Sequence, residues 1–103
     1  AAVEPAGSEV LAGRPITKAR HLLQGTGYGN IPPQWNPQFA DEFLAVTDEE
    51  ATEYRRLLAE KESLHVGFSA AANVCAAVKL IQSGRLGAAP TVATILCDTG
   101  LKY

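Results

Sequence analysis

Short apolar runs alternate along this chain with longer stretches in which apolar residues recur at helical spacing. Residues 1–4 (AAVE) and 43–46 (FLAV) are two such runs, and a third, residues 91–97 (TVATILC), is rich in β-branched side chains. Runs of this length predict buried strands, and the third has the composition of a central parallel strand. Pro5 is expected to end the first strand.

The residues after position 46 predict a helix that runs to about residue 61. Thr47 and Glu50 have the spacing of a capping box, in which each side chain accepts a hydrogen bond from the backbone N–H of the other residue. The apolar face of this helix is expected to consist of Ala51, Tyr54, Leu57 and Leu58. Its opposite face is expected to be solvated and without a function, and carries Glu49, Glu53, Arg56 and Glu60.

A second helix is predicted from about residue 70 to residue 83. One side of it is expected to carry Ala71, Val74, Val78 and Ile81. Because alanine and cysteine fill much of the remaining surface, we expect this helix to pack on more than one face. Gly84 follows as a plausible C-terminal stop.

Strands that alternate with helices in this way indicate an α/β fold. Three strands and two helices are few for an independent domain, and a strand as apolar as residues 91–97 needs cover on both faces. Exposed sheet edges also favour association. We therefore expect residues 1–103 to be part of a larger protein, or partner chains to complete the sheet.

Composition and charge exclude several classes of function. The chain has 103 residues and a net charge of −2, which fits one soluble globular unit. Its apolar runs are much shorter than the roughly 20 residues that cross a membrane, and residues 1–5 do not read as a signal peptide. Because the basic residues are scattered and outnumbered by acidic ones, we expect neither a nucleic-acid surface nor a membrane partner.

The two cysteines, Cys75 and Cys97, lie in apolar surroundings and lack the C-x-x-C spacing. Buried free thiols in a reducing compartment are favoured over a disulfide. No metal site is expected, because His21 and His65 have no ligand-like spacing to either cysteine.

The segment with the clearest chemical potential is residues 64–74 (LHVGFSAAANV). A short apolar run turns at Gly67 and reaches Ser69, and a helix of small residues follows. This order places one hydroxyl at the positive end of a helix, which stabilises electron-rich ligand atoms. The alternative is that Ser69 only caps the helix, since serine is a preferred N-cap residue.

Two further segments could contribute to a site. Residues 24–30 (QGTGYGN) are rich in glycine, but Ile31-Pro32-Pro33 follows, so a phosphate-binding fingerprint is not expected. The segment is either a loop whose backbone approaches a small ligand or a tight connector. Asp98 follows the last predicted strand, where ligands of α/β sheets bind, although a turn residue is equally compatible with that position.

Four segments match the motifs of one enzyme family in the right order. Residues 4–11 (EPAGSEVL) meet Glu-Pro-x-x-Ser-x-Val-Leu, and residues 21–27 (HLLQGTG) loosely meet His-Lys-Ile-Gln-Gly-Ile-Gly. Residues 67–72 (GFSAAA) correspond to Gly-Ile-Ser-Ser-Gly-Ala, and residues 97–103 (CDTGLKY) to Pro-Asp-Ser-Gly-x-Arg-Tyr. The chain thus resembles the cysteine synthase (O-acetylserine sulfhydrylase) and cystathionine β-synthase family of tryptophan-synthase-β-like enzymes.

The resemblance implies a three-layer (αβα), mostly parallel sheet that belongs to the large domain of a fold-type II enzyme. It implies pyridoxal 5'-phosphate as the cofactor, with Ser69 hydrogen-bonded to the nitrogen of its pyridine ring. Gly25, Thr26 and Gly27 would line the substrate pocket, and Asp98 would lie just behind the residues that contact the cofactor.

The same resemblance places the Schiff-base lysine, the loop that binds the substrate carboxylate and the phosphate cradle upstream of Ala1. Residues 1–103 would then be the C-terminal portion of the cofactor domain and inactive by themselves. None of Lys18, Lys61, Lys79 and Lys102 lies in a context like that of the family lysine. Two departures from the family pattern are Ala71, which replaces a glycine, and Cys97, which replaces a proline.

The leading interpretation of function is β-replacement, in which O-acetylserine and sulfide give L-cysteine through an aminoacrylate. The alternatives are a related β-replacement (cystathionine formation, or a cysteine lyase with sulfite as acceptor) and a non-catalytic paralogue, because a fold does not fix a function. The resemblance further implies a cytoplasmic homodimer, with serine acetyltransferase as a candidate partner.

Overall fold

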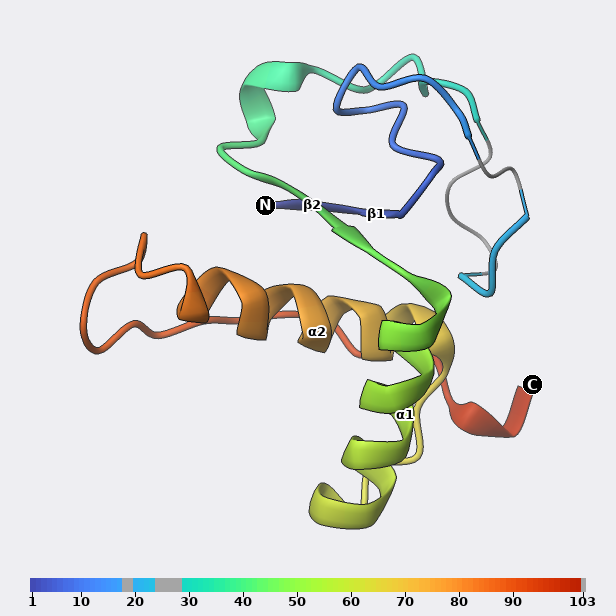
Figure 1. The fold of residues 1–103 in the computed structure, drawn as a ribbon, viewed down its shortest axis with the longest axis vertical. Coiled ribbons are helices and arrows are strands. Elements are labelled where there is room, and N and C mark those ends of the chain that lie inside the picture. The colour runs from blue at the N-terminus through green and yellow to red at the C-terminus, as the bar shows by residue number, and fades with distance from the viewer. Residues whose placement is uncertain (18–19, 24–28, 103) are drawn as a thin grey trace.

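The computed structural model describes residues 1–17, 20–23 and 29–102. Its elements are, in chain order, strand β1 (Ala2–Pro5), the 3-10 turn η1 (Pro37–Phe39), strand β2 (Phe43–Val46), helix α1 (Asp48–Glu62), helix α2 (Phe68–Gln82) and the 3-10 turn η2 (Gly100–Lys102). Figure 1 shows both helices on one side of the strands and the irregular segment that follows β1 on the other. Within the described ranges, no helix is both long and apolar enough to span a membrane.

Strands β1 and β2 pair in parallel, with Ala2 opposite Phe43 and Pro5 opposite Val46. This arrangement confirms the predicted α/β fold and its parallel sheet. Pro5 is the last residue of β1 rather than the residue beyond it. Helix α2 packs against both strands and against α1, so it forms the centre of the structure.

Glu4 is a buried carboxylate that fixes the path of the chain after β1. It is only 5% exposed. Its two carboxylate oxygens accept hydrogen bonds from the backbone N–H groups of Leu11, at 3.0 Å, and Ala12, at 3.1 Å. Buried charges are tolerated when their hydrogen-bonding capacity is used in this way. The Glu-Pro motif therefore has a structural role in this chain: it folds residues 5–12 back onto the end of the strand.

Helix α1 starts as the sequence predicts. The Thr47 hydroxyl accepts a hydrogen bond from Glu50 N at 3.1 Å, and the Glu50 carboxylate accepts one from Thr47 N at 3.0 Å. The helix ends at Ser63, which adopts a left-handed conformation with φ 55°. Ala51 and Leu58 of the predicted apolar face are buried. Both the capping box and this face are therefore confirmed.

Helix α2 begins two residues earlier than expected, at Phe68, and its buried face differs from the predicted one. Val74 and Val78 are only half-buried, and Ile81 is exposed. The buried residues of the helix are small: Ser69, Ala70, Ala71, Ala72, Cys75 and Ala76. Small side chains let the helix backbone approach α1 and the strands closely, which explains why the larger residues lie at the margin. Gly84, with φ 77°, ends the helix as predicted.

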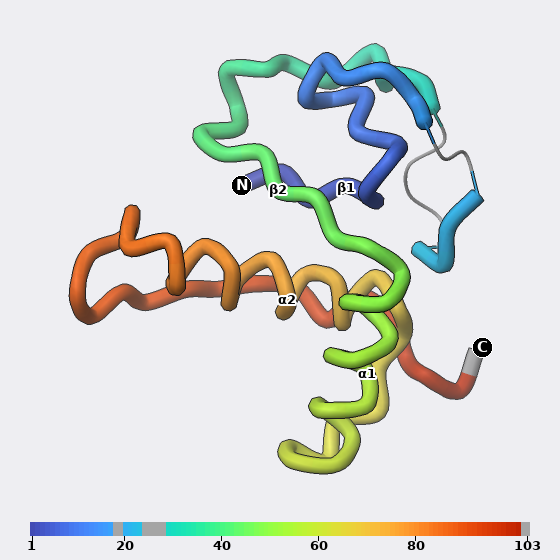
Figure 2. The backbone as a smooth tube through the Cα atoms, viewed as in Figure 1, coloured from blue at the N-terminus to red at the C-terminus, as the bar shows by residue number. Residues whose placement is uncertain are grey.

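Residues 91–97 do not form the predicted central strand. They are extended and exposed in this part of the structure, and Ile95 is 71% exposed. A strand requires backbone hydrogen bonds to a neighbouring strand. Among the described residues, this stretch is instead held by the Asn73 side chain, whose Nδ2 donates to Ile95 O at 2.9 Å. Figure 2 shows the segment passing along α2. Cys97 is consequently exposed, which corrects its expected burial, while Cys75 is buried and both thiols are free.

Lys79 connects α2 to the start of α1. Its ammonium lies 2.7 Å from one Glu50 carboxylate oxygen and 2.8 Å from the other, and it donates to Ala45 O at 3.0 Å. Burial raises the pKa of the Glu50 carboxyl, but hydrogen bonds from Lys79 and Thr47 and the Lys79 charge outweigh it and bring the pKa below its ordinary value. The ionised form of Glu50 therefore stabilises the fold.

We expect the Glu50→Gln variant of the complete protein to lose stability in a pH-dependent way. Glutamine keeps one oxygen for the capping box, and it removes the charge and one of the two oxygens that face Lys79. Because the folded pKa is depressed, the stabilisation is present above the unfolded pKa of about 4.3 and is lost as the pH falls through the folded pKa. Denaturation of both proteins from pH 7 to pH 3 should show a difference of up to about 1 kcal/mol at pH 7 that shrinks below about pH 4.

The matched control for this measurement is Glu62→Gln. Glu62 is exposed at the end of α1, so its removal should change the unfolding free energy by less than about 0.5 kcal/mol. A Glu50→Gln difference that stays constant across this pH range would show that the ion pair with Lys79 does not stabilise the protein.

Candidate functional site

Ser69 is a buried residue inside the first turn of α2. The N-cap residue is Gly67, in an extended conformation and without a side-chain capping bond, and Ala71 N donates to Gly67 O at 3.1 Å to begin the helix. Ser69 is 9% exposed. The prediction that Ser69 caps the helix is therefore wrong. The other alternative from the sequence, a hydroxyl beside the positive end of a helix, agrees with this position.

Asp98 packs directly against the turn that leads to Ser69. Gly67 N donates to Asp98 O at 3.3 Å. A Cβ atom on residue 67 would lie only 2.1 Å from Asp98 Oδ2, so with any other residue here the Asp98 carboxyl group would have to move. The structure thus brings Asp98 next to the N-cap of α2, and a carboxylate is favourable there because of the helix dipole.

Two backbone contacts join the segment before α2 to the end of the described chain. Val66 and Thr99 form an isolated antiparallel bridge, and Gly100 N donates to His65 O at 3.1 Å. A Cβ atom at position 100 would lie 2.4 Å from the His65 ring. In Figure 1 the end of the chain, in red, consequently lies beside the start of α2. The segments 65–69 and 98–100 therefore pack side by side and are joined by backbone hydrogen bonds.

Arg55 of α1 contacts both of these segments. The sequence reasoning did not identify it. Its Nε donates to Val66 O at 3.0 Å, and one terminal nitrogen donates to Gly100 O at 3.0 Å. The guanidinium carbon lies 4.7 Å from the centre of the Phe68 ring, in a cation–π arrangement. Helical spacing could have indicated this role, because Arg55 follows buried Ala51 by four residues and precedes buried Leu58 by three.

The predicted substrate-pocket residues Gly25, Thr26 and Gly27 lie outside the described residues. The chain just before them is fixed in place. Leu22 N donates to the Asp48 carboxylate at 2.9 Å, and Leu23 is buried in the core at 3% exposure. Lys79, one of the lysines considered above, is held by Glu50 and Ala45 rather than aimed at Ser69.

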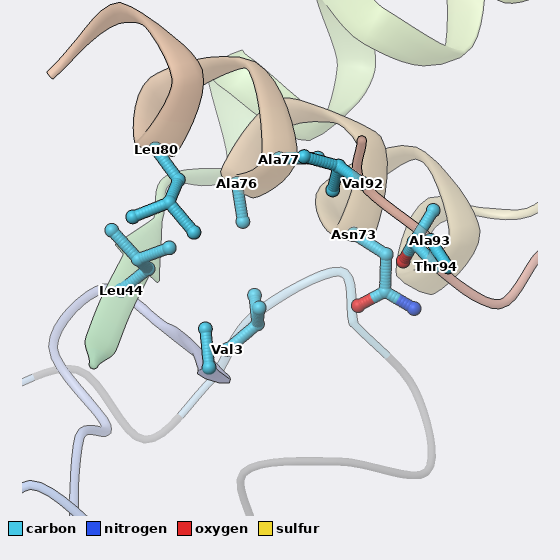
Figure 3. Close-up of a pocket in the computed structure, with 10 residues that line it drawn as sticks. Val3, Leu44, Asn73, Ala76, Ala77, Leu80, Val92, Ala93 and Thr94 are labelled. Atoms are coloured by element: carbon cyan, nitrogen blue, oxygen red, sulfur yellow. The ribbon is translucent and has the colours of Figure 1, made fainter. Parts of the chain in front are cut away.

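A separate cavity of about 150 Å³ lies between the strands, α2 and the extended segment. Figure 3 shows Val3 and Leu44 facing Ala76 and Leu80 across it, with Asn73 at one end. Its lining is mostly apolar and includes neither Ser69 nor Asp98, so it is distinct from the site at the start of α2. Among the described residues, no group of three or more His, Cys, Asp and Glu side chains could hold a metal ion.

Comparison with known proteins adds independent information. The sequence model of the pyridoxal-phosphate dependent enzyme family matches residues 1–98. A probable cysteine synthase from Bacillus subtilis is 40% identical over 101 residues, which cover 98% of this chain and 31% of that protein. The chain therefore spans about a third of the length of such relatives.

Solved structures of related enzymes are also similar to this chain. Cysteine synthase from Entamoeba histolytica superposes with a TM-score of 0.86 and 27% identity, over 98% of this chain and 29% of that one. The O-acetylserine dependent cystathionine β-synthase from Helicobacter pylori superposes with a TM-score of 0.74 and 37% identity, over 95% of this chain and 30% of that one. These neighbours are enzymes of fold type II.

Proposed function

The chain belongs to the pyridoxal-phosphate dependent enzyme family, and from this premise we propose that the complete protein forms L-cysteine from O-acetylserine and sulfide. Similarity to cysteine synthases extends over nearly the whole chain, in sequence and in structure. The observation that carries the proposal is the position of Ser69, a buried serine in the first turn of α2.

The chemistry at the start of α2 fits the ring of this cofactor. Ser69 offers a neutral hydroxyl that can donate to or accept from a ring nitrogen, and the positive end of the helix disfavours a proton on that nitrogen. The cofactor supplies the electron withdrawal that cleaves bonds next to its attachment point, while the protein sets how strong this withdrawal is. Ser69 would hold the ring nitrogen unprotonated, which favours elimination over reactions that need a long-lived carbanion.

Asp98 supports this role without contacting the ring in our proposal. It packs on Gly67, the residue two positions before Ser69, and so fixes the turn from which the first turn of α2 starts. Its negative charge also lies near the positive end of the helix, where it is stabilised. We propose that Gly25, Thr26 and Gly27 complete the substrate side of the pocket.

Cystathionine formation from O-acetylserine is the second candidate, and the Helicobacter pylori neighbour favours it because it is 37% identical. The two reactions share the first substrate and differ in the thiol or sulfide that is added. In this proposal the residues around Ser69 take part in the step that both reactions share, the elimination from O-acetylserine. They do not distinguish sulfide from a thiol, so the choice of nucleophile has to be measured.

The test is an absorption spectrum of the complete protein before and after O-acetylserine is added. We expect a cofactor band that shifts on addition of O-acetylserine and returns when sulfide is supplied, with cysteine as the product. Return of the band with homocysteine but not with sulfide would support cystathionine formation instead. A protein without a cofactor band, even after cofactor is supplied, would contradict both and favour a non-catalytic paralogue.

The free thiols of Cys75 and Cys97 support a reducing, cytoplasmic location. The homodimer and the association with serine acetyltransferase stay predictions that rest on the family resemblance. Light scattering of the complete protein, alone and with that enzyme, would measure both.

A further inference from the structure

Arg55 and Arg56 are adjacent in α1 but have different surroundings. Arg56 is exposed and forms ion pairs with Glu53 and Glu60 on the solvent side of the helix. Arg55 is half-buried, on the side of α1 that faces the start of α2, where it contacts two backbone carbonyls and one aromatic ring. The Arg55 guanidinium donates to neutral backbone carbonyls and not to carboxylates. Such charge-assisted bonds fix the position of the backbone segments that accept them.

The three contacts of Arg55 are made with the turn that leads to Ser69 and with the segment packed against that turn. Val66 O belongs to the residue before the N-cap Gly67, and Phe68 is the first residue of α2 and directly precedes Ser69. Gly100 O belongs to the segment that begins at Asp98. One side chain therefore connects the turn before Ser69, the first residue of its helix and the segment packed against that turn.

Besides the hydrogen bond from Gly100 N to His65 O at 3.1 Å, the backbone contacts between these segments are weak. Gly67 N and Asp98 O are 3.3 Å apart, which is the long end of the normal range, and the bridge between Val66 and Thr99 is isolated. Arg55 adds two charge-assisted bonds, to Val66 O and Gly100 O, together with a cation–π contact on Phe68. Lysine cannot reproduce this set, because its ammonium is a single point charge on a flexible stem.

We propose that Arg55 is a positioning residue for Ser69: its guanidinium clamps residues 64–67 to residues 98–100 and thereby fixes the direction of the Ser69 hydroxyl. This inference rests on the proposed function, in which that hydroxyl meets the ring nitrogen of the cofactor. Arg55 acts through the backbone and does not contact the ring itself.

The experiment compares Arg55→Lys and Arg55→Gln with the matched control Arg56→Gln, all in the complete holoenzyme. Amide hydrogen exchange, measured at Gly67 and Gly100, reports the clamp directly and does not depend on turnover. We expect exchange at both amides to be at least about tenfold faster in the Arg55 variants and unchanged in the control. Should Arg55→Gln fail to fold, Arg55→Lys decides the result.

The second readout is the cofactor itself. In the Arg55→Lys variant we expect the pH dependence of the cofactor band to change and kcat to fall about tenfold, while KM for O-acetylserine stays within about twofold. Exchange that is unchanged in both Arg55 variants would overturn the clamp. Faster exchange with an unaltered band and unaltered kcat would overturn the positioning role and leave the proposed function intact. A wild-type protein without a cofactor band would overturn the proposed function, and the positioning role with it.

Discussion

Ser69→Asp, introduced into the complete protein, should leave the cofactor bound but lower turnover by about two orders of magnitude. A carboxylate in place of the hydroxyl would stabilise a proton on the ring nitrogen and so change how strongly the ring withdraws electrons. The substituted position is 9% exposed, so solvent would screen this charge poorly. Absorption spectra recorded across a pH series, together with kcat, would measure both effects.

Ser69→Ala is the milder form of the same test. It removes one hydrogen bond and adds no charge, so turnover should fall about tenfold, which corresponds to roughly 1.4 kcal/mol. Ser83→Ala is the matched control, since Ser83 is an exposed serine at the opposite end of α2 whose hydroxyl donates to Leu80 O and accepts from Arg85 N, both close in sequence. Equal turnover in the Ser69 variants and the control would remove Ser69 from the mechanism.

The second large effect is expected from Gly67→Ala. The added Cβ would lie 2.1, 2.4 and 2.6 Å from Oδ2, Cγ and Oδ1 of Asp98, so the carboxyl group has to move. Residue 67 has φ −80°, which alanine adopts freely, so the cost comes from the collision alone. Forcing an extra carbon into a packed contact costs about 1–3 kcal/mol, which denaturation of the complete protein would measure.

A double variant tests whether the collision with Asp98 is the cause of this loss. All three atoms that the new Cβ would meet belong to the Asp98 side chain. Asp98→Ala should therefore restore most of the stability that Gly67→Ala loses, which gives a coupling free energy of about 1 kcal/mol or more. Additive effects of the two substitutions would show that residue 67 and the Asp98 side chain are not in contact.

The comparison of α1 with α2 shows which local features the sequence can predict. The capping box of Thr47 and Glu50 involves residues three apart, and its bonds form in any helix that begins there. The start of α2 depends on a distant residue. Serine is the better N-cap by preference, but the N-cap of α2 is Gly67, which packs against the distant Asp98, and the helix starts at Phe68.

Residues 91–97 were predicted as a strand from composition alone, and this was wrong for the described structure. A β-branched apolar run has the propensity for a strand, but the strand exists only when a neighbouring backbone pairs with it. The same dependence on distant partners explains why Cys97, expected to be buried, is exposed. The adjacent Asp98 was expected near a ligand site beyond this strand; the structure places it against Gly67, before α2, and its role there stays a prediction.

The sequence by itself determined the two short strands, α1 with its cap, the end of α2 at Gly84 and the membership in a family of pyridoxal-phosphate enzymes. These depend on contacts between near neighbours or on short motifs that are legible in the chain. Tertiary structure decided the N-cap at Gly67, the small-residue face of α2 and the clamp by Arg55. The Arg55 bonds reach carbonyl groups 11 and 45 residues away, and backbone carbonyls are the same at every residue, so no sequence pattern could identify which ones it would bind.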